Sequence, residues 1–324
     1  MQTHEFSVQP KHIIWFQVAG LSEEHVGMLR FASAVNERKT SLESMECLGK
    51  MWSYNFFKLR PQSGQGFLSQ MTGKDDIVGT CQDYQHEPVW KIFDRLSYKT
   101  YILESGARAD ESVLKAADCE TASVTDSFLS DVTIWNMGKA KSAADAKFFH
   151  HQDKVIEGFD KTGIFYDRAC QEGNCFSSLS ENARALFKRM GSEKKNYVYI
   201  VRDFSFEAKL KEGKIAEARE ILFEIEKLIN FFKTEAGTDP LMQVLVTSSA
   251  ARPIEFPDQG VPWLEFENQG KNILYKKTAL TSPAFSFGAS SENFCGFFSE
   301  AEVFSRLLWF KTGRDRKGFE GFWY

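Results

Sequence analysis

The chain has 324 residues, of which 43% are hydrophobic, and it carries 40 Lys and Arg against 44 Asp and Glu. This composition is ordinary for a globular protein that buries a large core. A net charge of −4 without a basic stripe argues against nucleic acid as a partner. No segment reaches the roughly 20 apolar residues of a membrane-spanning helix, so we expect no membrane span.

The N-terminus and the cysteines bear on the cellular compartment. The first residues lack the basic start and the apolar run of a signal peptide. The six cysteines show no metal-type spacing, and the closest pair, Cys170 and Cys175, fits neither a redox motif nor a common zinc site. We therefore predict reduced thiols and a cytoplasmic location. A short basic stretch, 311–317, is interpreted as solvated surface.

Strand-like and helix-like segments alternate along the N-terminal part of the chain. The apolar run 12–18 predicts a buried strand. Ser22, with two acidic residues after it, predicts the start of a helix that continues to about residue 31. A further helix is expected over 88–96 and a strand over 98–103. This order is typical of an α/β protein.

The pattern is weaker between about residues 106 and 195. This stretch is rich in Ala, Ser and Asp, and it predicts a helix over 142–159 and a loop over 163–176. We interpret the stretch as an insertion, or cap, over one edge of a single domain that spans residues 1–324.

Regular alternation returns in the C-terminal part. An amphipathic helix is expected from Ile215 to Phe232, and a last helix over 299–310. Strands are expected over 197–201, 243–247, 272–275 and 284–287. The alternation favours a three-layer α/β/α sandwich with a mostly parallel central sheet. Sites in such sheets form beyond the carboxyl ends of the strands, which here are residues 19–20, 202–203 and 248–250.

A serine in a glycine-rich turn is the most distinctive local feature. Ser63 is followed by Gly64 and Gly66 and then by an apolar stretch that ends in Thr72-Gly73. Glycines let the backbone approach a ligand closely, and the N-terminus of a following helix attracts an anion. The same Ser-Gly-x-Gly pattern also occurs in plain turns, so the motif alone leaves both interpretations open.

Several segments together resemble the alkaline phosphatase superfamily. The serine turn with its Thr-Gly is similar to the nucleophile segment of that superfamily, and residues 13–21 resemble its first strand and turn. The strand that ends at residues 245–250 is similar to its Val-Thr-Ala-Asp-His element, and residues 282–288 with 299–309 to its terminal strand and helix. The resemblance covers most of the chain except 106–195. It implies an alkaline phosphatase-like fold with Ser63 at the position of the nucleophile.

The same resemblance implies that the metal sites are lost. The superfamily holds two metal ions with Asp and His side chains. The corresponding positions, including that of the Asp before the nucleophile, are Ala19, Gln62, Glu207, Lys211, Ser249, Ala250 and Lys277. Zinc needs three or four converging N, S or carboxylate ligands, and no histidine follows His151. We therefore expect a degenerate member of the superfamily with no metal and no cofactor.

Three functions follow as hypotheses. The first is a catalytically inactive protein, a pseudoenzyme that acts as a scaffold or regulator through a protein partner. The second is a metal-independent site for a small anion such as a phosphate or sulfate ester. Its candidate contacts are Ser63, Gly64, Lys211, Arg252 and Lys277. Against this, Lys211 lies in a lysine-rich stretch that is typical of solvated surface.

The third hypothesis is a hydrolase that uses Ser63 with a base that the sequence does not reveal. His25 and His86 have no assigned place. His150 and His151 fall in the predicted helix over 142–159, where adjacent side chains point about 100° apart and do not easily share a metal. We interpret that pair as cap surface.

Overall fold

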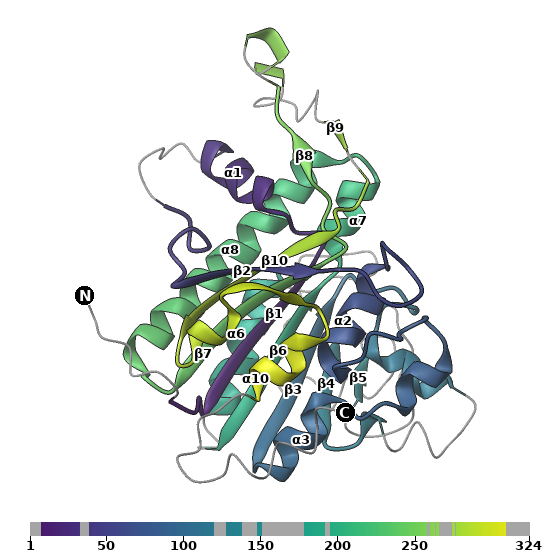
Figure 1. Ribbon diagram of the computed structural model, residues 1–324. Helices are drawn as coiled ribbons and strands as arrows, with labels where there is room; N and C mark the ends of the chain where they lie inside the picture. Colours follow the sequence, from purple (N-terminus) through teal and green to yellow (C-terminus); the bar gives the residue numbers. More distant parts are fainter. Residues whose placement is uncertain are drawn as a thin grey trace.

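The computed structural model describes residues 8–32, 39–119, 128–137, 148–150, 178–191, 195–257, 260–262, 264–265, 274–275 and 277–308. These residues form a nine-stranded sheet in the order β11-β2-β10-β7-β1-β6-β3-β4-β5 (Figure 1). Its strands are β1 (His12–Ala19), β2 (Cys47–Trp52), β3 (Tyr98–Ser105), β4 (Val132–Asn136), β5 (Phe148–His150), β6 (Asn196–Asp203), β7 (Met242–Ser249), β10 (Thr281–Gly288) and β11 (Gly296–Ser299). Within this sheet β10 alone runs antiparallel to its neighbours, β7 and β2.

Helices cover both faces of the sheet. They are α1 (Glu23–Ala32), α2 (Ser63–Thr72), α3 (Val89–Arg95), α6 (Leu179–Gly191), α7 (Ser205–Lys211), α8 (Ile215–Thr238) and α10 (Glu302–Leu307), with the 3-10 helices η1 (Cys81–Gln85), η2 (Val113–Asp118) and η3 (Ser291–Phe294). A small antiparallel pair, β8 (Ile254–Glu255) and β9 (Leu274–Tyr275), forms a second sheet. None of the helices described is long and apolar enough to cross a membrane.

Alternate residues of the central strands face two separate cores. Ile14 and Phe16 of β1 pack with residues of α1, α6, α7 and α8. Ile13 and Trp15 of the same strand pack with residues of α2, α3 and α10 on the other face. Successive side chains of a strand point to opposite faces, so a strand covered on both sides must be apolar throughout. This explains the continuous apolar run 12–18 and confirms the expected three-layer α/β/α architecture.

Most expected elements are present, and two differ. The last helix is shorter than predicted, because α10 ends at Leu307. The helix predicted over 142–159 is wrong at residues 148–150, which form β5 and pair in parallel with β4. Two consecutive aromatic residues suit a strand, and the free edge of β4 supplies backbone partners that a helical reading of the sequence could not anticipate.

The weak segment 106–195 contributes to the central layers. Its described residues supply β4 and β5 to the sheet and α6 to the core around α8. The predicted loop over 163–176 and much of the predicted cap lie outside the described residues, as do the basic stretch 311–317 and His151. The cap therefore stays a prediction.

Four cysteines form disulfides, which sequence analysis did not anticipate. The pairs are Cys47–Cys295 and Cys81–Cys119, with Cα separations of 5.3 and 5.4 Å. The prediction of reduced thiols is wrong for these four residues, because partners 248 and 38 positions apart meet only through the fold. Cys170 and Cys175 lie outside the described residues. Disulfides persist in oxidising compartments, so the cytoplasmic location stays a prediction that these bonds do not favour.

Candidate functional site

The carboxyl ends of three central strands meet at one edge of the sheet. In the parallel registers, Val18 of β1 is paired with Asp203 of β6 and with Ser248 of β7. The turn after β1, the helix α7 after β6 and the loop after β7 therefore lie side by side. This is the edge at which parallel α/β sheets bind ligands, and it is the edge that the sequence indicated.

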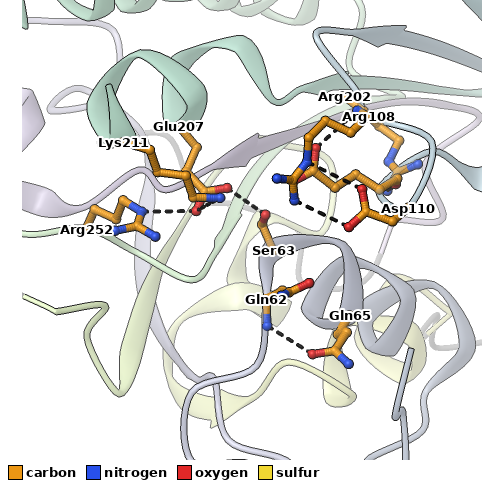
Figure 2. Close-up of polar contacts among 10 residues, drawn as sticks. Gln62, Ser63, Gln65, Arg108, Asp110, Arg202, Glu207, Lys211 and Arg252 are labelled. Atoms are coloured by element: carbon orange, nitrogen blue, oxygen red, sulfur yellow. Dashed lines mark hydrogen bonds and ion pairs between the residues drawn. The ribbon is translucent and has the colours of Figure 1, made fainter. Parts of the chain in front are cut away.

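A buried carboxylate, that of Glu207 in α7, joins three other residues that the sequence singled out (Figure 2). The hydroxyl of Ser63 donates to Glu207 Oε2 at 2.7 Å. Glu207 Oε1 accepts from Lys211 Nζ at 2.8 Å and from Arg252 Nε at 3.0 Å. The side chain of Glu207 is 2% exposed, whereas those of Lys211 and Arg252 are 35% and 25% exposed. The two cations thus bind the carboxylate from the side nearer to solvent.

The position of Glu207 follows from the way α7 starts. Asp203, the last residue of β6, accepts from the Ser205 hydroxyl and, at 2.9 Å, from the Phe206 amide. Burial raises the pKa of Asp203 to about 6, and these hydrogen bonds oppose the shift. Gly20 lies against α7 and has a φ of +77°. A Cβ at this position would lie 2.8 Å from Glu207 Cγ. Only glycine combines this backbone conformation with so close an approach.

Backbone hydrogen bonds place Arg252 beside the same carboxylate. The amide of Gly20 donates to the Ser249 carbonyl at 2.9 Å, and the amide of Arg252 donates to the Gly20 carbonyl at 2.9 Å. The turn after β1 and the loop after β7 are therefore fixed to each other. Arg252 reaches Glu207 from a loop that has its own backbone partners.

Ser63 is the first residue of α2, a helix of 10 residues. Gln65 Oε1 accepts from the amide of the N-cap residue Gln62 at 3.1 Å. The amides of Ser63 and Gly64 stand where a helix has no acceptor of its own, and the helix dipole favours an anion at this end. Gly64 is close to another segment, because a Cβ there would lie 3.2 Å from Glu111 Cα.

The remaining positions at this edge carry no metal-type donor set. Ala19 is buried with Phe67 and Phe204. The hydroxyl of Ser249 donates to Glu300 Oε2 at 3.3 Å. Ala250 is buried and has φ +51°, an unusual conformation for a residue other than glycine.

Lys277 does not join the Glu207 cluster. It is exposed and makes no hydrogen bond or ion pair with any residue that the structure describes. The carbonyl of its neighbour Thr278 accepts from Arg60 Nε at 2.7 Å. Of the five proposed anion contacts, the structure therefore brings together Ser63, Lys211 and Arg252, and not Lys277.

Glu300 is a buried acid that sequence analysis missed. It is 3% exposed, and burial raises its pKa to about 8, an effect opposed by hydrogen bonds from Ser53 and Ser249. A side chain on Gly66 of α2 would overlap both Ser249 Oγ and Glu300 Oε2. In the sequence, Glu300 is indistinguishable from an ordinary acid at the start of the last helix, so no local signal identifies it.

A second buried charge pair, Arg202 with Glu104, lies at the ends of β6 and β3. The guanidinium bonds the Glu104 carboxylate, and its Nε donates to Gln17 Oε1 at 2.8 Å. Glu104 also accepts from Asn136 Nδ2 at 2.7 Å and from the Val113 amide at 3.0 Å. Both charged side chains are at most 1% exposed. The sequence marked this strand end but not the pair, which links residues far apart in the chain.

None of the histidine side chains that the structure describes contacts Ser63. His25 is fully buried, its Nδ1 accepts from the Ser22 amide at 2.9 Å, and burial lowers its pKa to about 3. His86 lies 3.5 Å from a carboxylate oxygen of Asp76. His150 ends β5, and the pair His150–His151 is therefore not on a described helix.

Glu300 generates a pH-dependent prediction. Its pKa in the folded protein, about 8, lies above the usual value of 4.5. Between these two pH values Glu300 is therefore protonated in the folded protein and ionised in the unfolded chain. The free energy of unfolding consequently falls as pH rises from about 4.5 to 8. Glu300→Gln should remove this loss, which is at most about 1.4 kcal/mol per pH unit. Urea unfolding of both proteins across this range measures the difference, and parallel pH profiles would contradict the assignment.

Comparison with known proteins shows a similarity of fold. No protein-family model and no curated protein matches the chain. Its structure is similar to the alkaline phosphatase of the Antarctic bacterium TAB5, with a TM-score of 0.65, 13% identity, and 93% of this chain and 98% of that chain covered. A cold-active alkaline phosphatase from a psychrophilic Shewanella species gives a TM-score of 0.67, 10% identity and coverage of 92% and 98%. That of Thermus thermophilus gives a TM-score of 0.67, 10% identity and coverage of 93% and 90%. The chain therefore has the alkaline phosphatase-like α/β fold that several of its segments together led us to expect.

Proposed function

We propose that this chain is a catalytically inactive protein with the alkaline phosphatase fold, which acts as a scaffold or regulator by binding a partner. The observation that carries the proposal is the state of Glu207. Its carboxylate occupies the edge where the family's chemistry takes place, and it accepts from Ser63, Lys211 and Arg252 together.

The residues at this edge do not fit the two metal ions that the fold family implies. Ala19 and Ala250 offer no side-chain donor, and Ser249 is bonded to Glu300. The described residues contain no group of three His, Cys, Asp or Glu side chains that could hold a metal ion. Zinc requires three or four such ligands, and the cations that bind Glu207 repel a metal ion. No step through a metal is derived for this chain.

Glu207 stands in for an anionic ligand. A phosphate at a helix N-terminus accepts from a serine hydroxyl and from Arg and Lys side chains, and the Glu207 carboxylate accepts from the same set. Its attachment to α7 makes this anion part of the protein. Ser63 is also without an imidazole partner among the described residues, which supports a non-catalytic role.

A second candidate function is metal-independent binding of a phosphate or sulfate ester. The observation in its favour is the charge of the cluster: two cations share one carboxylate, which leaves an excess of one positive charge beside the N-terminus of α2. The hydroxyl of Ser63 also lies within hydrogen-bond reach of a carboxylate, as a serine hydrolase would require. The two experiments below separate these functions.

The first experiment measures turnover. Purified protein should hydrolyse neither phosphate monoesters nor diesters above the rate of Ser63→Ala, with or without added Zn²⁺, Mg²⁺ or Mn²⁺. The reason is that the described residues offer no set of metal ligands and that the carboxylate beside the serine is already paired with two cations. Release of p-nitrophenol is the readout. Hydrolysis by the wild type that Ser63→Ala abolishes would contradict the proposal and favour an enzyme.

The second experiment replaces the internal anion. Glu207→Gln should leave Lys211 and Arg252 without their carboxylate, so that millimolar phosphate raises the melting temperature of the variant by about 2 °C or more while leaving the wild type unchanged. Glu212→Gln, on an exposed acid directly after the same helix, is the control and should not respond. A clear phosphate response of the wild type itself would favour the anion-binding function over the scaffold.

A further inference from the structure

An exposed turn directly precedes the serine helix. Residues 56–60, with the sequence Phe-Phe-Lys-Leu-Arg, are all exposed, and Phe56, Phe57 and Leu59 have exposed fractions of 80%, 61% and 70%. Large apolar side chains gathered at one exposed place mark an interaction surface. In the chain, the turn ends three residues before Ser63, so this surface adjoins the candidate site.

Hydrogen bonds from a buried side chain hold this turn. Asn55 Oδ1 accepts from the amides of Phe57 and Lys58 at 3.0 and 2.8 Å, and Asn55 Nδ2 donates to the Ile77 carbonyl at 2.8 Å. The amide of Phe56 donates to the Asp75 carbonyl at 2.9 Å. The backbone of the turn is thus fixed, and its apolar side chains face solvent as a consequence of that backbone.

Four exposed cations accompany the turn: Lys58, Arg60, Lys74 and Lys277. Lys74 precedes Asp75, whose carbonyl binds the turn, and Lys277 precedes Thr278, whose carbonyl accepts from Arg60. None of the four has an acidic partner in the part of the chain that the structure describes. The neighbouring acid Asp76 is paired with His86. Two acids, Asp75 and Asp76, directly follow Lys74, and Glu302 near Asp75 is paired with Arg306. The four cations therefore outnumber the unpaired acids, and the surface carries an excess of positive charge.

Aromatic side chains continue the surface onto the edge of the sheet. The ring of Trp52 in β2 lies 6.2 Å from that of Tyr54 and 6.0 Å from that of Phe297 in the edge strand β11. All three side chains are exposed. The chain runs from β2 through Tyr54 into the turn, so we call residues 52, 54, 56–60 and 297 the aromatic-basic surface.

We propose that the aromatic-basic surface binds an anionic lipid membrane from one side, without a spanning segment. This inference deepens the proposed function, because it names the chemistry of the partner. Phe, Trp, Tyr and Leu side chains partition into the boundary between lipid headgroups and acyl chains, and nearby Lys and Arg side chains are attracted to anionic headgroups. Both components are present here on one fixed turn.

The surface suits a lipid interface better than the other partners that we considered. Its apolar side chains belong to an exposed turn and alternate with cations, whereas the centre of a protein interface is depleted of charged residues. A nucleic acid would stack its bases on aromatic rings, and the surface offers such rings, but stacking has no use for the exposed side chain of Leu59, which a lipid interface would bury. The fluid, negatively charged surface of an anionic membrane accommodates both the alternation of apolar side chains with cations and the excess of positive charge.

Co-sedimentation with vesicles tests the proposal. The whole chain should sediment with vesicles of phosphatidylcholine and phosphatidylglycerol in equal amounts, and much less with phosphatidylcholine alone. Phe57→Ser combined with Lys58→Glu should weaken binding to the anionic vesicles about tenfold or more. High salt should weaken binding by the wild type, because headgroup attraction is screened.

The matched control changes the same residue types elsewhere. Phe223 on α8 is 45% exposed and lies under Lys227, with 4.3 Å from Nζ to the ring centroid. Phe223→Ser with Lys227→Glu should bind vesicles like the wild type, and equal melting temperatures show that both variants are folded. Three results would overturn the proposal. The first is that the wild type does not bind vesicles, and the second is that it binds neutral and anionic vesicles equally. The third is that the protein self-associates through this surface, in a way that Phe57→Ser with Lys58→Glu removes. Vesicle binding is measured without any substrate. A protein that does not bind vesicles would therefore contradict this inference alone, whereas only the turnover assay tests whether the protein is catalytically inactive.

Discussion

The buried carboxylate of Glu207 is the interaction on which the candidate site depends. It accepts from the first residue of α2, from its own helix α7 and from the loop after β7, so a single group closes the edge where three strands end. Glu207 is 2% exposed, so loss of its cations would leave a buried carboxylate without compensation, which is unfavourable. The site is therefore built as a self-contained ion cluster, with its anion supplied by the chain.

The central sheet is stabilised by packing interactions that do not involve the ion cluster around Glu207. The central strands are apolar on both faces and pack against two helix layers, and a separate buried pair, Arg202 with Glu104, joins the ends of two strands. An alkaline phosphatase-like sheet can thus persist while the residues at its edge change. The proposed function therefore rests on those edge residues and on the adjacent surface, since a fold alone does not determine an activity.

Sequence patterns predicted what depends on local order. The run 12–18 indicated a central strand because burial on both faces leaves only apolar residues, and the serine turn placed Ser63 at a helix start. The resemblance to alkaline phosphatases also selected Glu207 and Lys211, and the hypothesis of an anion site added Arg252. The structure brings these three residues together. What failed depends on contacts between distant segments: β5 on the edge of β4, the two disulfides, and buried Glu300. Lys277 lies outside the cluster, in a segment whose backbone binds Arg60 through the carbonyl of Thr278.

Zinc stoichiometry tests the central claim most directly. The protein is exposed to excess Zn²⁺, passed through a desalting column and analysed by elemental mass spectrometry. It should retain no stoichiometric zinc. Ala19, Ser249 and Ala250 supply no ligands, and Glu207 is held by two cations. Glu207→Gln should behave in the same way. Two zinc ions retained per chain would contradict this account and restore the reading of the protein as a metal-dependent hydrolase.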